Sequence, residues 1–259
     1  INDILGNLIG TDAGGTTGVP NGESGVSLTS ARHNTVGGYT TAERNVISGN
    51  DRHGVHLTGG NVEENDVVGN YIGTTADGKS ALGNDQYGVF LEAGEDHGVE
   101  GNVISANEHG VVIGGGAWNA RSNTIINNTV GLTADGVSPL GNAGNGIYIR
   151  RPGQSNDVAN NHIAHNGSNG VEVSGSGAVD NRITHNSIHD NDALGIRLIS
   201  GGNYEIDAPT IEDVNPETMT VSGTICPGCA VEIFASPNGD GEGEIWLGWG
   251  VAETSNFEV

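Results

Sequence analysis

The chain has 259 residues, enough for one large domain or for one domain followed by a smaller one. It carries 32 acidic residues against 9 lysines and arginines, a formal net charge of −23, and only 4% of its residues are aromatic. This charge argues against nucleic acid as a partner, because phosphate binding needs a basic surface, and it disfavours anionic membranes. No apolar run approaches the length of a membrane span, so we expect no membrane insertion.

The chain begins directly in repeat-like sequence, INDILGN, and its most informative feature is one recurring short motif. The motif is Asn, three residues, Gly, Val or Ile, any residue, and then Leu, Ile or Val. Copies begin at Asn21, Asn50, Asn84, Asn142, Asn166 and Asn191, and a copy at Asn107 is one residue shorter. The first and third positions after the glycine are apolar, and this period of two predicts a very short strand with one buried face.

A second motif, Asn-x-(Ile/Val)-x-x-Asn, lies between the copies of the first. It begins at Asn45, Asn65, Asn102, Asn123, Asn161 and Asn181. Asparagine tolerates turn conformations and bonds its own chain, so it is suited to the corners that bracket each strand. Stacked coil upon coil, such side chains can form amide ladders that satisfy one another.

Every second coil contains a polar insertion of 14 residues, which we call an arm. The arms are the 14 residues that follow Asn7, Asn70 and Asn128, and they end at Asn21, Asn84 and Asn142. The repeating unit is therefore a pair of coils, one short and one long, and the arms are expected on one side of the molecule. Their acidic residues Asp12, Asp77 and Asp135 lie two coils, or about 10 Å, apart, which is too far for one shared metal ion.

Strands this short cannot form a hairpin core, but they can stack at about 4.8 Å per coil. The sequence therefore predicts an all-β fold, with a parallel β-helix of alternating short and long coils over residues 1–203. Hairpin-based sandwiches are the competing all-β fold, and the repeated register of the apolar positions disfavours them. Residues 204–259 contain longer alternating runs and predict a small, incomplete β-sandwich-like module.

The stretches NVISGN and GNYIGTTADGKSALGN and the first motif resemble the right-handed parallel β-helix repeats of pectin-lyase-like architecture, as found in large secreted or surface-attached microbial proteins. The tail from Gly223 to Val259 resembles the β-sandwich segment that often follows such repeats. The resemblance implies the fold and an extracellular or cell-surface location. It also raises catalysis on polysaccharides, by a lyase, hydrolase or epimerase. The NTD, GHG, RIK and DPHD motifs of the related enzymes are missing here, which disfavours catalysis.

A histidine cluster is the best catalytic or metal-binding candidate. His165 and His185 occupy the same slot of consecutive copies of the second motif, so we expect them to stack one coil apart, with Asp190 in the next corner. Two imidazoles at that distance are able to bind a divalent metal ion or share general-base work. An exposed polar ladder explains the same pattern, and we favour it because no third ligand is fixed by spacing.

Three further groups of residues are candidates for sugar binding, calcium binding and a disulfide. Tyr87, Phe90 and Tyr148 adjoin the first motif, and they predict either a sugar-stacking strip or simple shielding of the sheet. Asp240 and Glu242 lie in an acidic Gly-rich run that resembles a calcium loop, although a solvated hairpin turn is the favoured reading. Cys226-Pro-Gly-Cys229 lacks the other ligands of a zinc site and the context of a redox motif. It predicts a short disulfide, with free thiols as the alternative.

These observations favour a non-catalytic extracellular structural or adhesive protein. Its partners are expected to be other copies of itself, in a surface assembly or filament, or an extracellular polysaccharide. No cofactor is required, and calcium is the one metal ion that the sequence suggests. The alternative is a carbohydrate-active β-helix protein or a glycan-binding rod.

Overall fold

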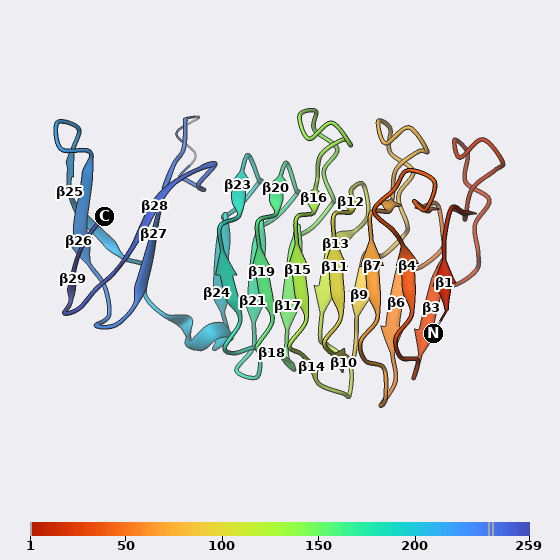
Figure 1. The fold of residues 1–259 in the computed structure, drawn as a ribbon, viewed down its shortest axis with the longest axis horizontal. Helices are drawn as coiled ribbons and strands as arrows, with labels where there is room; N and C mark the ends of the chain where they lie inside the picture. The colour runs from red at the N-terminus through yellow and green to blue at the C-terminus, as the bar shows by residue number, and fades with distance from the viewer. Residues whose placement is uncertain (1, 238, 240) are drawn as a thin grey trace.

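The computed structural model describes residues 2–237, 239 and 241–259. This part of the chain winds through seven parallel coils that stand side by side, and it ends in two small antiparallel sheets at one end of the molecule (Figure 1). The predicted all-β fold, the parallel β-helix and the sandwich-like character of the C-terminal strands are confirmed.

Each described coil contributes one strand to each of three parallel sheets. The first sheet contains β1 (Asp3–Ile4), β4 (Thr35–Gly37), β7 (Asp66–Val68), β11 (Gly98–Glu100), β15 (Thr124–Ile126), β19 (Asp157–Ala159) and β22 (Arg182–Thr184). The second contains β2 (Leu8–Ile9), β5 (Val46–Ile47), β8 (Tyr71–Ile72), β12 (Val103–Ile104), β16 (Thr129–Val130), β20 (His162–Ala164) and β23 (Ser187–His189). The third contains β3 (Val26–Thr29), β6 (Val55–Thr58), β9 (Tyr87–Leu91), β13 (His109–Ile113), β17 (Ile147–Arg150), β21 (Val171–Ser174) and β24 (Ile196–Ile199).

Smaller elements complete the fold. A minor parallel sheet at one corner contains β10 (Gly94–Glu95), β14 (Ala120–Arg121) and β18 (Gly153–Gln154). After β24 the short 3-10 helix η1 (Gly202–Glu205) leads into the C-terminal strands. One antiparallel sheet contains β25 (Thr210–Asn215), β26 (Thr220–Thr224) and β29 (Asn256–Glu258), and the other pairs β27 (Ala230–Ala235) with β28 (Ile245–Val251).

The copies of the second sequence motif belong to two different sheets. The sequence analysis expected consecutive copies to stack on one another, as if they all lay on one side of the coil. Copies in β7, β15 and β22 belong to the first sheet, and copies in β5, β12 and β20 belong to the second. The two sides share an asparagine, as in residues 156–166, where one motif ends at Asn161 and the next begins there. Neighbouring copies in the sequence are therefore not always neighbours in the stack.

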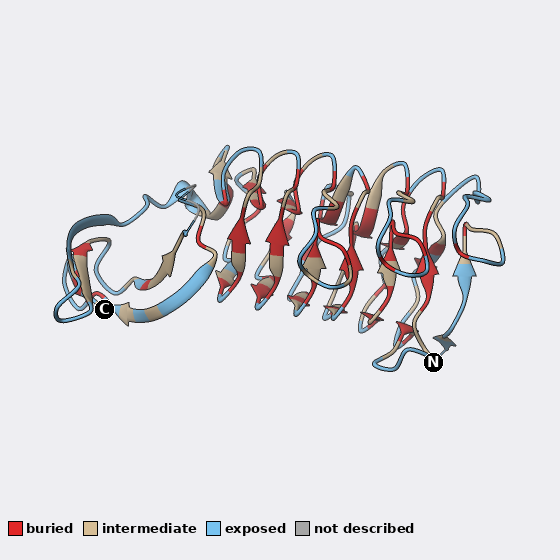
Figure 2. Cartoon of the chain, turned by 90° about the horizontal axis from the view of Figure 1, so that it is seen from above, coloured by how far each residue is buried: buried red, intermediate tan, exposed pale blue. Residues whose placement is uncertain are grey.

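The core consists of columns of apolar side chains that run along the helix axis. One column follows the third sheet, where Leu57 pairs with Leu91 and Leu91 with Ile113. These side chains are fully buried, and buried residues recur in the strands of successive coils along the β-helix (Figure 2). Because each side chain packs on an apolar side chain one coil away, burial supports every coil only in the presence of its neighbours.

Asparagine ladders run along three corners of the β-helix. In a typical rung the backbone N–H and the side-chain amide donate to the Oδ1 of the asparagine one coil further on, as from Asn102 to Asn128 at 3.0 Å for both bonds. The side-chain amide also donates to a backbone carbonyl of the preceding coil, as from Asn128 to Val99 at 2.8 Å. The second ladder, for example, runs through Asn7, Asn45, Asn70, Asn102, Asn128, Asn161 and Asn186.

The arms emerge on one side of the molecule from the first, third and fifth coils, in agreement with the predicted alternation (Figure 1). A buried serine in the preceding short coil anchors the second and third arms. The Ser48 hydroxyl donates to the Thr74 carbonyl at 2.7 Å and accepts from the N–H of Gly73 at 3.0 Å. Gly73 has a φ of +89°, and a Cβ there would lie 2.1 Å from the Ser105 carbonyl oxygen, so the start of this arm requires glycine.

Neighbouring arms also contact one another directly. The N–H of Ala76 donates to the Gly15 carbonyl, and the N–H of Ala134 donates to the Gly78 carbonyl, both at 2.9 Å. Within the second arm, the Asp77 carboxylate accepts from the Thr75 hydroxyl at 2.7 Å, and this bond lowers the pKa of Asp77. The arms therefore form an ordered row, with their acidic residues used to hold each turn.

Loss of one buried rung should destabilise the β-helix strongly. Replacement of Asn128 by Ala leaves the Asn102 N–H and amide and the Val99 carbonyl without their partner. We expect a loss of about 3 kcal/mol in the free energy of unfolding, because several buried polar groups lose hydrogen bonds together. Urea unfolding measures this loss. Asn21→Ala, at an exposed rung with one bond to Asn50, is the control and should lose less than about 1 kcal/mol.

His97 takes the place of an asparagine in the ladder that runs through Asn34, Asn65 and Asn123, and it should make the protein acid-sensitive. The ring is 1% exposed, its Nδ1 accepts from the N–H of Asn65 at 3.2 Å, and burial lowers its pKa from 6.5 to about 4. Between these pH values the unfolded chain binds a proton that the folded chain does not. Stability should therefore fall as the pH falls from about 6.5 to about 4, by up to about 3 kcal/mol.

His97→Asn should reduce this loss, as measured by urea unfolding at several pH values. His33→Asn, at an exposed histidine of the same corner, is the matched control. An unchanged pH dependence in His97→Asn would contradict the assignment.

Candidate functional site

A strip of aromatic and imidazole rings covers the outer face of the third sheet. We call it the ring strip, and it comprises His53, His56, Tyr87, Phe90, His109, Tyr148 and Arg150. It forms because the variable position of the first motif points outward and adjacent coils are in register. His56 pairs with Phe90, Phe90 with Val112, and Val112 with Tyr148.

The rings of the strip contact one another in an unbroken series. His56 stacks on Phe90 with 4.9 Å between ring centres, and His53 stacks on Tyr87 at 4.8 Å. His109 bridges the series onward, with its ring centre 5.6 Å from that of Tyr87 and 5.6 Å from that of Tyr148. Contacts across four coils therefore hold the rings in fixed positions.

Arg150 places a cation over these rings. Its guanidinium carbon lies 5.5 Å from the ring centre of Phe90, 5.6 Å from that of Tyr87 and 5.9 Å from that of Tyr148. Its Nε donates to the Gly114 carbonyl at 3.3 Å, which fixes the side chain across the sheet. These distances are within the range of cation–π attraction.

The members of the strip differ in exposure, and this separates two roles. Phe90 is only 7% exposed, so it forms the floor of the strip and fits the shielding role. Tyr87, Tyr148 and Arg150 are partly exposed, so parts of their side chains are accessible to solvent. The structure thus brings together the three aromatic residues that the sequence selected, and it adds Arg150 and the histidines, which the sequence analysis did not include in the strip.

Burial disfavours the charged form of two imidazoles of the strip, and a carboxylate lies at its border. Burial lowers the pKa of His53 to about 4, and the neighbouring His56 and Arg52 act in the same direction. Burial also lowers the pKa of His109. At the border, the Glu92 carboxylate accepts from Thr58 at 2.6 Å and contacts His56 Nε2 at 2.8 Å. Although burial opposes the shift, these hydrogen bonds hold the pKa of Glu92 below its usual value.

The expected stacking of His165 on His185 is wrong. The register pairs His162 with Ser187 and Ala164 with His189, so His165 lies beside position 190. The cause is that two copies of the second motif share an asparagine and lie on different sheets of one coil. The copy that contains His165 therefore stacks on a copy other than the one that contains His185. His162 and His189 are the pair that meets, with their Nε2 atoms 2.8 Å apart. The ring of His165 lies near, with its centre 6.0 Å from that of His189.

His185 and Asp190 have different surroundings. His185 contacts the C-terminal strands, where its Nδ1 lies 3.1 Å from a Glu232 oxygen and its ring centre lies 5.1 Å from that of Trp246. Asp190 contacts His189, with its Oδ2 2.8 Å from Nδ1 of that ring. The three catalytic candidates therefore do not form one site, and a catalytic role for them stays a prediction.

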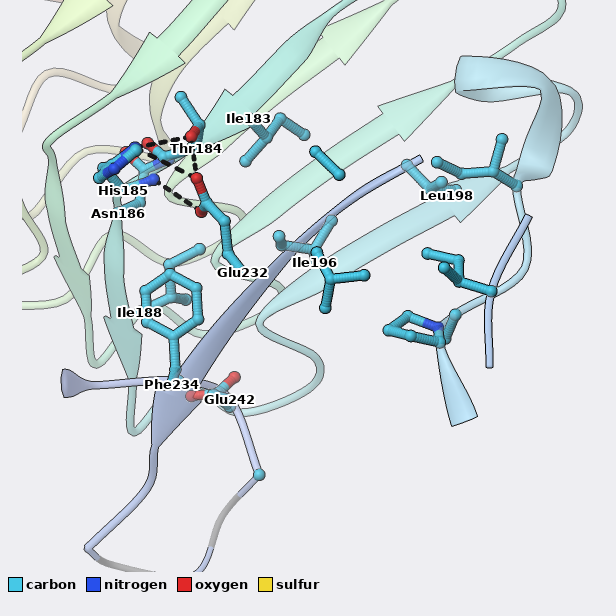
Figure 3. A pocket seen from close by; sticks show the side chains of 18 of the residues that line it. Ile183, Thr184, His185, Asn186, Ile188, Ile196, Leu198, Glu232, Phe234 and Glu242 are labelled. Atoms are coloured by element: carbon cyan, nitrogen blue, oxygen red, sulfur yellow. Dashed lines mark hydrogen bonds and ion pairs between the residues drawn. The ribbon is translucent and has the colours of Figure 1, made fainter. Parts of the chain in front are cut away.

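The C-terminal strands contact part of the last coil, and an open cavity of about 640 Å³ lies between them. Its apolar wall includes Ile183, Ile196 and Phe234, as Figure 3 shows. Glu232 enters from β27, accepts from the N–H of His185 at 2.9 Å and also bonds the Thr184 hydroxyl (Figure 3). The carboxylate therefore satisfies polar groups at the end of the first and second sheets.

Glu242 does the same for the asparagine ladder that runs through Asn142, Asn166 and Asn191. Its Oε2 accepts from the N–H of Asn191 at 2.8 Å and from the side-chain amide of Asn191 at 3.3 Å. It thus takes the place that the next asparagine oxygen would occupy. Asp240, its predicted companion in calcium binding, lies outside the described residues, and calcium binding stays a prediction. Cys226 and Cys229 are joined by a disulfide in the turn before β27.

The chain matches the family model described as "Periplasmic copper-binding protein (NosD)" over residues 16–136 and 79–206. The matched segments overlap and include the coils from the first arm to the end of the β-helix, so the chain belongs to the NosD family of β-helix repeat proteins. Comparison with curated proteins returns no match. The family description supports a periplasmic or secreted location. In the described residues no helix has the length and hydrophobicity needed to cross a bilayer.

Removal of the Glu242 carboxylate should loosen the end of the β-helix. In Glu242→Ala the Asn191 N–H loses its acceptor, so we expect its amide hydrogen exchange to accelerate by about tenfold. Exchange read by NMR or mass spectrometry at residues 184–194 tests this. Glu244→Ala is the control, because the contact of Glu244 with Ser187 uses its backbone oxygen. Equal exchange in both variants would show that the carboxylate does not cap the ladder.

Proposed function

We propose that this protein is a non-catalytic, rigid adhesive rod of the cell exterior, whose ring strip binds extended neutral polysaccharides. The observation that carries the proposal is the strip itself, with Tyr87 and Tyr148 partly exposed beside the fixed guanidinium of Arg150. Aromatic faces beside a few fixed polar groups are the chemistry that suits a sugar ring, which is apolar on its faces and carries hydroxyls at its edge.

The chemistry at the borders favours neutral glycans over polyuronates. The carboxylate of Glu92 lies beside His56 of the strip, and Glu172 is paired with Tyr148 one coil away. In the proposed complex these carboxylates accept hydrogen bonds from sugar hydroxyls, and the guanidinium of Arg150 donates to sugar oxygens. The chain as a whole carries a formal charge of −23, which repels a polyanion. A single cation over three rings does not reverse that charge.

The β-helix supports adhesion because it holds the strip rigidly. The ring-bearing strands belong to coils that are locked by the ladders on both sides, as at Asn84 and Asn107. A ligand that binds therefore costs little ordering of the protein, which improves affinity at a small contact area. The missing enzyme motifs support the non-catalytic half of the proposal.

Titration calorimetry with a soluble neutral β-glucan, a mannan, polygalacturonate and alginate tests the proposal. We expect binding to at least one neutral polymer and weaker binding to both polyuronates. Tyr148→Ala and Arg150→Gln should each weaken binding by about tenfold, since single buried anchors at an interface contribute on this scale. Tyr39→Ala, at an exposed tyrosine that bonds Glu100 on another sheet, is the matched control.

Two outcomes would count against this function. Equal affinities of Tyr148→Ala, Arg150→Gln and the unchanged protein would remove the strip as the binding surface. Release of unsaturated products or new reducing ends, lost on substitution of His165 or His185, would establish the carbohydrate-active alternative.

Copper is the ligand that the family description gives for NosD proteins, and the donor atoms of this chain allow a test of fit. No group of three or more His, Cys, Asp or Glu residues within the described ranges is arranged to hold a metal ion. Both cysteines are in the disulfide. The facing Nε2 atoms of His162 and His189 match copper in kind, because imidazole is one of its preferred ligands, and they supply two ligands.

Self-association through the ends of the rod, expected from the sequence, stays a prediction. Glu232 and Glu242 bond polar groups at the C-terminal end of the β-helix, whereas Leu194 and Ile196 of the last coil stay exposed there. Light scattering of the protein over a range of concentrations distinguishes monomers from chains of copies. A single mass at all concentrations would remove self-association from the proposal without affecting the polysaccharide-binding half.

A further inference from the structure

Trp118 is held on the surface of the β-helix by a glycine-rich segment, residues 114–119, which joins β13 to β14 and which we call the Trp118 loop. The indole is 56% exposed. Its six-membered ring lies against Gly60, where an added Cβ would be 3.3 Å from Cη2 and 3.5 Å from Cζ2. Because glycine has no side chain, the backbone supports the ring there, and more than half of the side chain faces solvent.

The Trp118 loop borders the ring strip. A Cβ added at Gly115 would lie 2.1 Å from Nε of Arg150, and one added at Gly116 would lie 2.5 Å from Cγ of Glu92. Arg150 ends β17 in the following coil, and Glu92 follows β9 in the preceding coil. The loop therefore reaches over both neighbouring coils and lines the edge of the strip at which Arg150 and Glu92 stand.

A line of outward residues leads from the strip to Trp118. His56 and Thr58 are the partly exposed positions of β6, and Gly60 follows two residues later, about 7 Å further along the chain direction. The Glu92 carboxylate bonds both His56 and Thr58. The surface that begins at the stacked rings of the strip thus continues past Glu92 to the indole.

A cleft of about 270 Å³ lies beside the indole. Two ion pairs of opposite charges stand there, Arg32 with Glu63 and Arg121 with Glu95, each at 2.6 Å. A carboxylate accepts hydrogen bonds at about four positions, so one guanidinium uses only part of its capacity. An aromatic face beside fixed donors and acceptors that carry no net charge together is suited to a neutral sugar ring.

We propose that Trp118 is a second stacking platform for the neutral polysaccharide, so that a bound chain crosses the ring strip, passes Glu92 and places one sugar on the indole. This inference rests on the proposed function, because one chain occupies both places. Glu95 and Arg121 then bond the hydroxyls of that sugar. Binding at two linked places raises the affinity for a chain long enough to reach both.

The emission of Trp118 gives a direct test. The chain has three tryptophans, and the other two, Trp246 and Trp249, lie in β28. Replacement of both by Phe leaves Trp118 as the only tryptophan, so the emission reports on the cleft alone. Titration of this double variant with the soluble neutral β-glucan and with the mannan should shift the emission to shorter wavelength for the polymer that binds, because the sugar removes water from the ring.

Substitution of the indole tests its share of the affinity. Trp118→Ala should weaken the calorimetric affinity for the same polymer by about tenfold, since an aromatic anchor is lost. Trp118→Phe keeps an aromatic face and should keep most of the affinity. Trp249→Ala is the matched control, because Trp249 is 59% exposed but lies in β28. Its affinity should equal that of the unchanged protein.

The outcomes separate this inference from the proposed function. Equal affinities of Trp118→Ala and the unchanged protein, or an unchanged emission while calorimetry shows binding, would overturn the inference and leave the ring strip as the binding surface. A loss in Trp118→Ala with none in Tyr148→Ala would contradict the shared path. If neither polymer binds, the proposed function is wrong and the inference with it. Should Trp118→Ala fail to fold, the emission titration decides, because it leaves the indole in place.

Discussion

The bond from one asparagine side chain to the next is the interaction on which this structure depends. Each buried corner of the β-helix exposes backbone N–H and C=O groups that strands of two or three residues cannot satisfy alone. The amide of asparagine supplies two donors and one acceptor at the right height, as in the series Asn70, Asn102 and Asn128. Without it, each coil would bury unpaired polar groups at its corners, and the apolar columns would not compensate. The same bonds hold neighbouring coils in register, and the register creates the ring strip and the histidine pair.

The end of the stack shows what the ladder requires of any neighbour. Glu242 gives its oxygen to Asn191, and Asn203 gives its Oδ1 to the N–H of Asn181 at 3.0 Å. One cap is a carboxylate from the C-terminal strands and the other is a side chain of η1. A different residue, from a different element, satisfies the same need for an acceptor. At the last coil these two side chains supply the acceptor oxygens that asparagines of a further coil would supply, although the chain there no longer follows the repeat.

The sequence predicted the coils, the alternation of the arms and the outward position of Tyr87, Phe90 and Tyr148, because all three depend on local periodicity. It did not predict which copies of the second motif are neighbours. That choice depends on the asparagine shared by two sides of one coil, and it moved the histidine contact from His165 and His185 to His162 and His189. The sequence did not predict Arg150 as part of the ring strip, because its position over the rings depends on a long side chain that reaches across three coils.

The serine anchors have a consequence for the length of such a molecule. Ser48 and Ser105 lie in short coils and hold the arm that follows, whereas the same slot before the seventh coil, which carries no arm, is Ala164. Addition or loss of one coil would place a serine against a coil with no arm, or an arm against a coil with no serine. Addition or loss of two keeps every anchor and every rung in place. The β-helix can therefore change length only by pairs of coils. The distance between neighbouring arms is the same wherever along the chain a pair of coils is gained.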